Sequence, residues 1–293
     1  MSLSVNVRDL TLEFEKVRAL DGVSFDIEAG KIYGLLGRNG AGKTTLMSVM
    51  AAFRKATSGQ VVVDGEEPWE NLNIVPRVCL IREGGDFVSS DTCRDVLSFG
   101  NYRPSWDQAY AEQLVEKFDV DLDKRVDQLS RGQRSVLAGI FGLASRAELT
   151  MFDEVHLGMD APTRQDFYQE LLTDYIENPR TIVISSHLID EISKYLEEVV
   201  IIHKGKLLLQ DSAETLQAAG ASLTGPTDKV DGFSVDLSVL SQQVLGSTKQ
   251  VTVSDVLTTQ QKTTAREQGI DVGPVGLQDL FIHLTSNGNS EVK

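Results

Sequence analysis

The sequence contains little cysteine, and its two cysteines are not arranged for chemistry. Cys79 and Cys93 form neither a CxxC pair nor a zinc-ligand spacing. We expect two reduced thiols with no part in the mechanism, as is usual in the cytoplasm. A fold held together by disulfides or by a cysteine-bound metal is therefore excluded.

Long apolar runs are absent as well. The longest, residues 136–144, is far shorter than the roughly 18 to 20 residues that cross a bilayer. Residues 1–10 contain no apolar segment preceded by basic residues, as a secretory signal would. Hydrophobic residues still make up 41% of the chain, which is enough for a continuous core. We therefore expect a soluble, cytoplasmic protein.

Positive charge is scarce. The chain has 28 Lys and Arg against 43 Asp and Glu, a net charge of −15. Such a surface repels both phosphate backbones and anionic lipid headgroups, and no basic cluster or basic amphipathic helix offsets it. We expect no nucleic-acid partner and no direct lipid binding, so any membrane association should run through another protein.

Alternating strands and helices predict an α/β fold. Apolar runs that end immediately before glycine or polar residues predict buried strands at 31–36, 149–152 and 181–184. Helical stretches lie between them, for example 43–53 and 162–176. This alternation favours a parallel sheet covered on both faces, which binds ligands beyond the carboxyl ends of its strands. Asp153, Glu154 and His187 should therefore share one edge with residues 37–44.

Two further layers are predicted around this core. A small antiparallel β layer is indicated by short strand-like runs separated by turns, at 5–14, 23–27 and 60–64. Residues 90–118 are mostly helical in pattern, with Ser105 as the N-cap of a helix over 106–118. We expect a helical subdomain at about 84–146, inserted between the first and second core strands.

The rest of the chain predicts a hairpin and a small accessory domain. A closing hairpin around a Lys204–Gly205 turn is predicted, with strands at 199–203 and 206–210. The composition then becomes rich in Ser, Thr, Gln and Gly, and we place a boundary near Ala219, between a main domain (1–219) and an α+β domain (220–293). Its predicted elements are strands at 232–235 and 250–253 and a helix at 277–286.

Residues 37–44, Gly-Arg-Asn-Gly-Ala-Gly-Lys-Thr, fit the P-loop pattern G-x-x-x-x-G-K-[ST]. The glycines let backbone N–H groups turn toward phosphates, and the helix N-terminus that follows adds its partial positive charge. Lys43 would bind the β- and γ-phosphates, and the Thr44 hydroxyl would ligate Mg²⁺. A chance glycine turn is the alternative, which the strand before and the helix after disfavour.

Two adjacent carboxylates follow the second apolar strand. Asp153 and Glu154 would repel one another unless a cation or a functional task kept them together. We interpret Asp153 as the carboxylate on the metal side and Glu154 as the general base that polarises the attacking water. A solvated pair at a helix N-terminus is the alternative.

Residues 129–133, Leu-Ser-Arg-Gly-Gln, resemble the signature sequence LSGGQ of ATP-binding-cassette (ABC) proteins. They lie between the P-loop and Asp153, as in that family. A D-loop-like run, Gly-Met-Asp at 158–160, and His187 after a strand complete the family's order. The resemblance covers residues 5 to about 216 and implies a P-loop NTPase core that binds ATP and Mg²⁺.

The resemblance also implies a dimer in which two subunits share each ATP site. Ser130 and Gly132 would face the γ-phosphate bound by the opposite subunit, Asp160 would contact that subunit, and His187 would hydrogen-bond the γ-phosphate and position Glu154. The implied nucleotide-binding residues are Phe14 (stacked on adenine), Gly37, Asn39, Gly40, Ala41, Gly42, Lys43, Thr44, Thr45, Ser130, Gly132, Gln133 and Asp160. The implied catalytic residues are Lys43, Glu154 and His187, and the implied metal ligands are Thr44, Glu83 and Asp153. Taken singly, Phe14 and His187 would be ordinary packing groups.

The chain departs from the family pattern at three positions. The Q-loop glutamine aligns with Glu83, whose carboxylate can ligate Mg²⁺ but, when ionised, cannot donate a hydrogen bond. Arg131 stands where the signature has its first glycine, and Val155 where a proline follows the catalytic glutamate. Water positioning at the site can therefore differ from the family's.

Residues 275–281 resemble the closing segment of subunits that serve ABC-2 type exporters, although a plain amphipathic helix explains them as well. In the exporter interpretation, four aromatic residues would help to form a groove for a helix of the membrane subunit: Phe87, Phe99, Tyr102 and Trp106. They could equally pack the helical subdomain.

Together these patterns predict the ATP-hydrolysing subunit of an ABC transporter, an exporter in our interpretation. It would pair with a second cassette subunit, identical or paralogous, and dock on a separate integral membrane subunit at the cytoplasmic face. A non-transport cassette ATPase acting on nucleic acid or ribosomes is the alternative, but the chain has one P-loop and no sustained heptads. A module that binds ATP without hydrolysing it is disfavoured because Lys43, Glu154 and His187 are all present.

Overall fold

The computed structural model describes residues 2–287, which form two compact units. Among the described residues, the first unit contains 2–187 and 200–210, and the second contains 188–199 and 211–287. Across residues 2–287, no helix has both the length and the apolar character needed to span a bilayer. The end of the predicted accessory domain, 288–293, lies outside the described residues, and its boundary near Ala219 stays a prediction.

A six-stranded sheet in the order β5-β6-β7-β3-β8-β9 forms the centre of the first unit. Its strands are β3 (Ile32–Leu36), β5 (Val78–Arg82), β6 (Leu149–Asp153), β7 (Thr181–Ser186), β8 (Glu198–His203) and β9 (Lys206–Ser212). Strands β5, β6, β7 and β3 run parallel, and every residue of β3, β6 and β7 is buried, as a sheet covered on both faces requires. The three predicted core strands are confirmed.

Strand β5 is a core strand that the apolar-run pattern did not predict. It follows a short 3-10 turn that contains Pro76, and it ends in Arg82 rather than immediately before a glycine or a carboxylate pair. The helical segment is therefore inserted between β5 and β6. It lies between the first two predicted core strands, β3 and β6, with β5 as an additional strand before it. Its α-helices are α2 (Cys93–Ser98), α3 (Gln108–Lys117) and α4 (Arg131–Ala144).

The helix predicted to begin after Ser105 begins later. Asp107 is the N-cap of α3, and its Oδ1 atom accepts a hydrogen bond from the Tyr110 backbone N–H at 2.9 Å. Serine and aspartate are comparable N-caps, so propensity alone could not choose between them. The Asp107 backbone N–H also donates to the Ala144 carbonyl at the end of α4, at 2.9 Å, and this tertiary contact fixes the start of α3.

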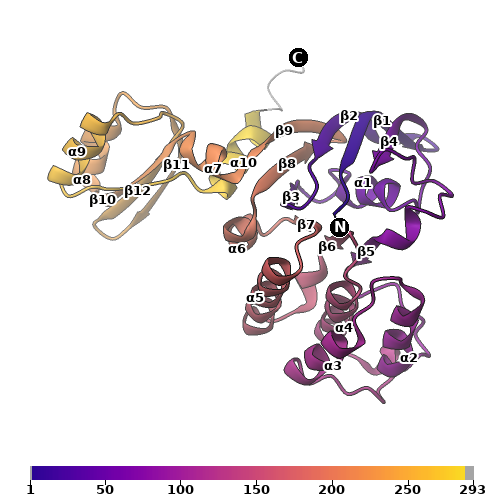
Figure 1. The fold of residues 1–293 in the computed structure, drawn as a ribbon. Coiled ribbons are helices and arrows are strands. Elements are labelled where there is room, and N and C mark those ends of the chain that lie inside the picture. Colours follow the sequence, from indigo (N-terminus) through magenta and orange to yellow (C-terminus); the bar gives the residue numbers. More distant parts are fainter. Residues whose placement is uncertain (1, 288–293) are drawn as a thin grey trace. The chain divides into compact units, whose positions relative to one another are not determined.

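The antiparallel layer is confirmed, with the strand order β2-β1-β4. Its strands are β1 (Val5–Phe14), β2 (Val17–Ile27) and β4 (Ser58–Val63). Helix α1 (Lys43–Met50) contacts β2, β4 and β6, so it lies between this layer and the core sheet. Helices α4 and α5 (Ala161–Glu177) cover the opposite face of the sheet, where the Phe152 and Phe167 rings meet edge to face at 5.6 Å. In Figure 1 the indigo layer and the magenta helices α2 and α3 lie at opposite ends of this unit.

The closing hairpin is also present. Strands β8 and β9 are neighbours in the sheet and are joined by Lys204 (φ 49°) and Gly205 (φ 76°). Two successive left-handed residues are what a two-residue hairpin turn with the native strand twist needs. The short 3-10 helices of the chain are η1 (Val75–Arg77), η2 (Phe99–Tyr102), η3 (Val126–Gln128), η4 (Val155–Gly158) and η5 (Ser193–Tyr195).

The second unit contains a module with the order β10-α8-β11-β12-α9-β13 (Figure 1). Its four-stranded sheet has the order β11-β12-β10-β13 with antiparallel neighbours, the split βαβ topology of ferredoxin-like folds. Val230 and Ala265, one from each helix, share a core with Leu223, Val251 and Val253. The elements of this unit are α6 (Ile189–Ile192), α7 (Ala213–Ala218), β10 (Ala221–Pro226), α8 (Thr227–Ser234), β11 (Val239–Leu245), β12 (Thr248–Val253), α9 (Thr259–Glu267), β13 (Asp271–Gly273) and α10 (Leu277–Asn287).

Of the predictions for this region, the strand at 250–253 and the helix at 277–286 are confirmed by β12 and α10. The strand predicted at 232–235 was wrong, because most of it belongs to α8. Val230 and Ser234 are both buried, and their spacing of four residues places them on one face of a helix.

Candidate active site

The predicted P-loop connects β3 to α1. Gly42 is the N-cap of α1 and has φ 109°, a conformation that other residues rarely adopt. A Cβ atom there would also lie 2.8 Å from the Ala19 carbonyl oxygen. The glycine is therefore required twice, by its backbone angle and by the close approach of β2, and it turns the start of α1 toward the cavity described below.

Lys43 is buried, with 6% of its surface exposed. Its Nζ atom donates a hydrogen bond to the Gly37 carbonyl at 2.7 Å and lies 3.3 Å from Oε1 of Glu154. The ammonium group is thus held between a carbonyl and a carboxylate, which satisfies a charge that would be costly to bury alone. Oxygen atoms of phosphate could replace both partners.

Asp153 and Glu154 leave the carboxyl end of β6 in different directions. Asp153 is the last, buried residue of the strand, and it accepts a hydrogen bond from the Ser185 hydroxyl at 2.5 Å. Glu154 adopts the left-handed conformation, with φ 54° and ψ 25°. Its Oε2 atom lies 3.0 Å from Nδ1 of His187. The predicted edge of the sheet therefore brings Lys43, Glu154 and His187 together.

A cavity of about 540 Å³ opens at this edge. Residues 39–45 of the P-loop line it together with Glu154, Val17 and the Lys204–Gly205 turn. Its volume lies within the range of small-molecule sites, and its lining combines backbone N–H groups, a lysine and a carboxylate. Asn39, Gly40, Ala41, Gly42, Thr44 and Thr45 all belong to this lining, as predicted for a triphosphate site.

The predicted signature residues form the start of α4. Ser130 is the N-cap, its Oγ atom accepts from the Gln133 backbone N–H at 3.2 Å, and Gln133 Oε1 accepts from the Ser130 N–H at 3.0 Å. This reciprocal capping box explains the Ser-x-x-Gln spacing. At Gly132 a Cβ atom would lie 2.7 Å from the Gly158 carbonyl oxygen, so the glycine lets the D-loop-like run approach the helix.

These residues line a second cavity, of about 730 Å³. Ser130, Gly132, Gln133 and Asp160 belong to it, and none of the P-loop residues does. Asp160 is the N-cap of α5, and hydrogen bonds from Thr163 hold the pKa of its carboxyl below the ordinary value. One chain therefore places the predicted site residues in two separate hollows.

Comparison with known proteins identifies the family of this chain. The sequence profile of the family described as "ABC transporter" matches residues 20–156. The bacitracin transport ATP-binding protein BcrA of Bacillus licheniformis is 32% identical over 212 residues, which cover 71% of this chain and 69% of that protein. This chain belongs to the ABC transporter family. It is therefore an ATP-binding subunit and an ATPase of that family.

Further similarity is found to another ATP-binding protein and to solved cassette structures. The ABC transporter ATP-binding protein YtrB of Bacillus subtilis (strain 168) is 28% identical over 204 residues, 69% of this chain and 70% of that protein. A solved ABC transporter ATP-binding subunit has a TM-score of 0.65 and 19% identity, covering 73% of this chain and 91% of that one. A dimeric ATP-binding cassette with ADP and phosphate, in a post-hydrolysis state, has a TM-score of 0.63 and 18% identity, covering 71% and 98%. These structures support the fold.

The oxygen donors predicted for Mg²⁺ fit that ion. Thr44 lines the first cavity, and Asp153 ends β6, so a hydroxyl and a carboxylate meet the preference of Mg²⁺ for hard oxygen ligands. Within residues 2–287 no group of three or more His, Cys, Asp and Glu side chains could hold a metal by itself. A cassette that binds Mg²⁺ would therefore share it with phosphate oxygens.

Gly37, Asp153 and His187 do not line the first cavity themselves, but Gly37 and His187 contact Lys43 and Glu154, which do, whereas Glu83 and Phe14 have other partners. Glu83 follows β5, and its carboxylate contacts Arg131. Phe14 is 37% exposed, and the Arg54 guanidinium lies 4.8 Å from the centre of its ring. The cavity lining contains Val17, which pairs with Phe14 across β1 and β2, but not Phe14 itself.

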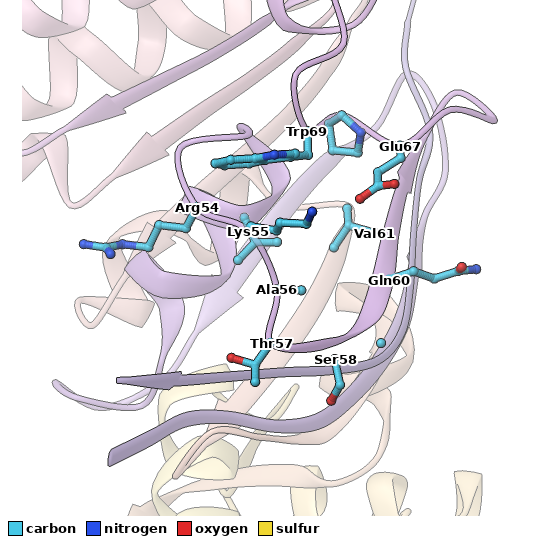
Figure 2. Close-up of a pocket in the computed structure, with 12 residues that line it drawn as sticks. Arg54, Lys55, Ala56, Thr57, Ser58, Gln60, Val61, Glu67 and Trp69 are labelled. Atoms are coloured by element: carbon cyan, nitrogen blue, oxygen red, sulfur yellow. The ribbon is translucent and has the colours of Figure 1, made fainter. Parts of the chain in front are cut away.

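A third hollow, of about 250 Å³, lies between the end of α1 and β4. Figure 2 shows its lining, with Trp69 and Glu67 on one side and Thr57 and Ser58 on the other. It contains Lys55, but it lacks a glycine-rich loop at a helix N-terminus and the pairing of a carboxylate with a histidine. None of the predicted site residues lines it, so it is separate from the active site of the cassette.

Sequence reasoning missed His156. Its side chain is only 2% exposed, and its Nε2 atom lies 3.1 Å from the Ser186 hydroxyl and 3.6 Å from Oε2 of Glu154. Burial, together with the charges of Arg164 and His187, lowers its pKa to about 4. The available signal was its position: it is one of four histidines in the chain and lies two residues after the predicted base.

Proposed function

We propose that this chain is the ATP-hydrolysing subunit of an exporter and works as a dimer with two ATP sites at the interface. The observation that carries the proposal is the division of the site residues between two cavities. Lys43 and Glu154 line the first, and Ser130 and Asp160 line the second. A second subunit that faces the first would complete each site.

Each side chain then has a distinct task. Lys43 would exchange its carbonyl and carboxylate partners for β- and γ-phosphate oxygens. Glu154, freed from that contact, would accept a proton from the attacking water, and His187 would hold its carboxylate in place. Mg²⁺, held by Thr44, Asp153 and Glu83, would neutralise charge on the phosphates. Ser130 and Gly132 would direct a hydroxyl and backbone N–H groups to the γ-phosphate of the opposite site.

Docking on a membrane subunit is the second part of the proposal. Two of the four predicted groove aromatics are packed, since the Phe87 and Trp106 rings lie 6.1 Å and 5.3 Å from the Phe141 ring. Phe99 and Tyr102 remain 48% and 86% exposed on η2, a short turn of the helical segment. They are the side chains that we propose for contact with a membrane subunit at the cytoplasmic face.

The proposed export direction is based on the C-terminal segment. Residues 275–281 resemble the closing segment of ABC-2 exporter subunits, and they cover the start of α10. Relatives of similar identity bear import names, such as the Fe(3+) ions import ATP-binding protein FbpC 2 of Haemophilus influenzae, 28% identical over 222 residues, which cover 72% of this chain and 62% of that protein. We propose export, and transport assays in vesicles that contain the membrane subunit would determine the direction.

The shared site is tested by the sedimentation mass of Glu154→Gln with ATP and with ADP. The amide keeps the shape of the side chain but cannot accept the proton, so hydrolysis should slow by orders of magnitude and an ATP-bound dimer should accumulate. ADP lacks the γ-phosphate that bridges the subunits and should leave a monomer. The experiment should include any paralogous cassette. Equal masses with both nucleotides would rule out the shared site.

A further inference from the structure

The two polar departures from the ABC pattern contact each other. The Arg131 Nε atom donates a hydrogen bond to Oε1 of Glu83 at 2.6 Å, and the Arg131 Nη2 atom contacts the same oxygen. These residues are 48 positions apart in the sequence. The family pattern has two neutral residues at these positions, a glutamine and a glycine, so this chain has an ion pair where that pattern has no charge.

Each member of the pair occupies a functional position. Glu83 follows β5 directly, and the last residue of that strand, Arg82, is the register partner of Asp153. Glu83 therefore leaves the sheet beside the proposed metal carboxylate. Arg131 is the first residue of α4 and follows Ser130 in the second cavity. The ion pair thus connects the two halves of the site machinery within one chain.

The backbone holds Glu83 at the corner of a turn. The Gly85 N–H donates to the Arg82 carbonyl at 2.9 Å, and Gly84 has φ 69°, as position three of a type II turn requires. The neighbouring charges are already engaged, since Arg82 donates to Asp86 at 2.7 Å and Arg134 donates to the Leu129 carbonyl at 3.3 Å. Arg131 is the cation that reaches the Glu83 carboxylate.

The Glu83–Arg131 ion pair can be broken at little cost in free energy. Arg131 is 67% exposed at its side chain and Glu83 35%, and an ion pair with this much water around it contributes little to stability. A divalent cation bound beside Asp153 is a stronger partner for a carboxylate than one exposed guanidinium. Breaking the pair would leave the Arg131 charge at the N-terminus of α4, where a phosphate is favoured.

We propose that Glu83 and Arg131 form a two-position switch that couples the two ATP sites of the dimer. This inference rests on the proposed function. In one position Arg131 holds Glu83. In the other, Glu83 ligates Mg²⁺ at the site of its own P-loop, and Arg131 binds the γ-phosphate held by the partner subunit. Binding of ATP and Mg²⁺ at one site therefore releases Arg131 to serve as a cation at the other site. In this role Arg131 is a phosphate-binding residue that the signature sequence does not include.

The switch makes opposite predictions for its two members. Arg131→Ala frees Glu83, so the Mg²⁺ concentration that half-saturates binding of a fluorescent ATP analogue should fall about threefold or more. The same variant loses the cation for the partner's phosphate, so dimerisation of Glu154→Gln should need more ATP. Glu83→Gln should raise the Mg²⁺ requirement and lower the ATP concentration needed for dimerisation.

The double variant decides whether these effects are coupled. In the Glu83→Gln background, Arg131→Ala should no longer change the Mg²⁺ requirement, because no carboxylate remains to be freed. Arg131→Lys keeps a cation at this position, so the ATP concentration needed for dimerisation should return from the Arg131→Ala value toward that of the parent. Arg94→Ala is a matched control, since it breaks an exposed ion pair with Asp123 elsewhere in the helical segment and should change neither quantity.

Additive effects in the double variant would overturn the switch. The Mg²⁺ titration measures nucleotide binding by a single subunit. It therefore tests the proposed role of Glu83 in Mg²⁺ binding even if no dimer forms. Failure of Glu154→Gln to dimerise would instead contradict the proposed function. A dimer that forms normally and responds to neither Glu83→Gln nor Arg131→Ala would contradict the switch alone.

Discussion

His187 Nδ1 lies 3.0 Å from Oε2 of Glu154, and this contact joins the carboxyl ends of β6 and β7. An ionised carboxylate only accepts hydrogen bonds, so Nδ1 carries the proton in this contact. The other ring nitrogen is then an acceptor when the imidazole is neutral. The histidine orients the carboxylate, whereas Lys43 neutralises it from the opposite oxygen at 3.3 Å.

His187→Ala should therefore slow hydrolysis without a comparable loss of ATP binding. Without its orienting partner Glu154 should be misplaced, and we expect turnover to fall by about 100-fold or more. Single-turnover hydrolysis and equilibrium binding would separate the two effects. His187→Gln keeps a donor and should retain part of the rate. A loss of affinity as large as the loss of rate would contradict the orienting role.

Lys43→Ala should abolish ATP binding at concentrations that saturate the unmodified protein. The lysine is the buried cation of the phosphate cavity, and charge-assisted hydrogen bonds to phosphate are among the strong ones. Equilibrium titration with a fluorescent nucleotide measures this. Lys55→Ala removes a lysine from the hollow in Figure 2 and is the control. Equal affinities for the two variants would disprove the site assignment.

Gly158→Ala should disturb the contact between the D-loop-like run and the signature helix. A Cβ atom at Gly158 would lie 2.6 Å from Ser135 Oγ and 2.7 Å from the Arg131 carbonyl oxygen. We expect about 1 to 3 kcal/mol of destabilisation from this overpacking, and weaker ATP-dependent dimerisation. Gly232→Ala in α8 meets nothing within 4 Å and should be neutral or stabilising. Denaturant unfolding of both variants is the measurement, and similar midpoints would contradict the steric argument.

Stability should depend on pH through His156. Its folded pKa of about 4 is below the ordinary value of 6.5, so between these pH values the unfolded chain binds a proton that the folded chain does not. Stability from this group is therefore present above pH 6.5 and is lost as pH falls toward 4, by about 3 kcal/mol in all. Urea unfolding at pH 5 and pH 7 should show a smaller difference in stability for His156→Gln than for the parent, and equal differences would contradict the role of His156.

The exposed aromatics of η2 should matter for association and not for nucleotide binding. Phe99→Ser with Tyr102→Ser should release the protein from membranes that contain its membrane subunit, while ATP affinity stays unchanged. High salt alone should not release the parent protein, because an apolar contact is screened little by ions. Retention of the double variant on such membranes would place the docking surface elsewhere.

The position of the active site could be predicted from the sequence because its residues follow the carboxyl ends of parallel strands. A parallel strand followed by a glycine loop, a carboxylate pair or a histidine places those residues at one edge whatever the loops do. The prediction of three parallel strands, at 31–36, 149–152 and 181–184, was therefore enough to predict that Lys43, Glu154 and His187 lie close together. The residues of the second cavity were predicted only through the resemblance to the ABC signature sequence, because hydrophobic periodicity does not distinguish them from other helix starts.

The errors have different physical causes, of which some are tertiary contacts and one is a local spacing. The start of α3 is fixed by the Ala144 carbonyl, which local N-cap preference does not include. The strand predicted at 232–235 ignored the helical face formed by Val230 and Ser234. The meeting of Glu83 and Arg131 spans two segments, so the two departures were recognised singly but their contact was not.

The left-handed conformation of Glu154 has a consequence for how this enzyme can change. An ordinary L-residue in that conformation costs about 1 to 2 kcal/mol, and glycine or asparagine would relieve much of it. Either substitution would also leave the buried Lys43 ammonium without its carboxylate, a larger cost, so neither should raise the melting temperature, and both should abolish ATP turnover. The left-handed backbone at Glu154 is therefore tolerated because the same residue neutralises a buried lysine, and a laboratory selection for heat resistance alone should not remove the catalytic base.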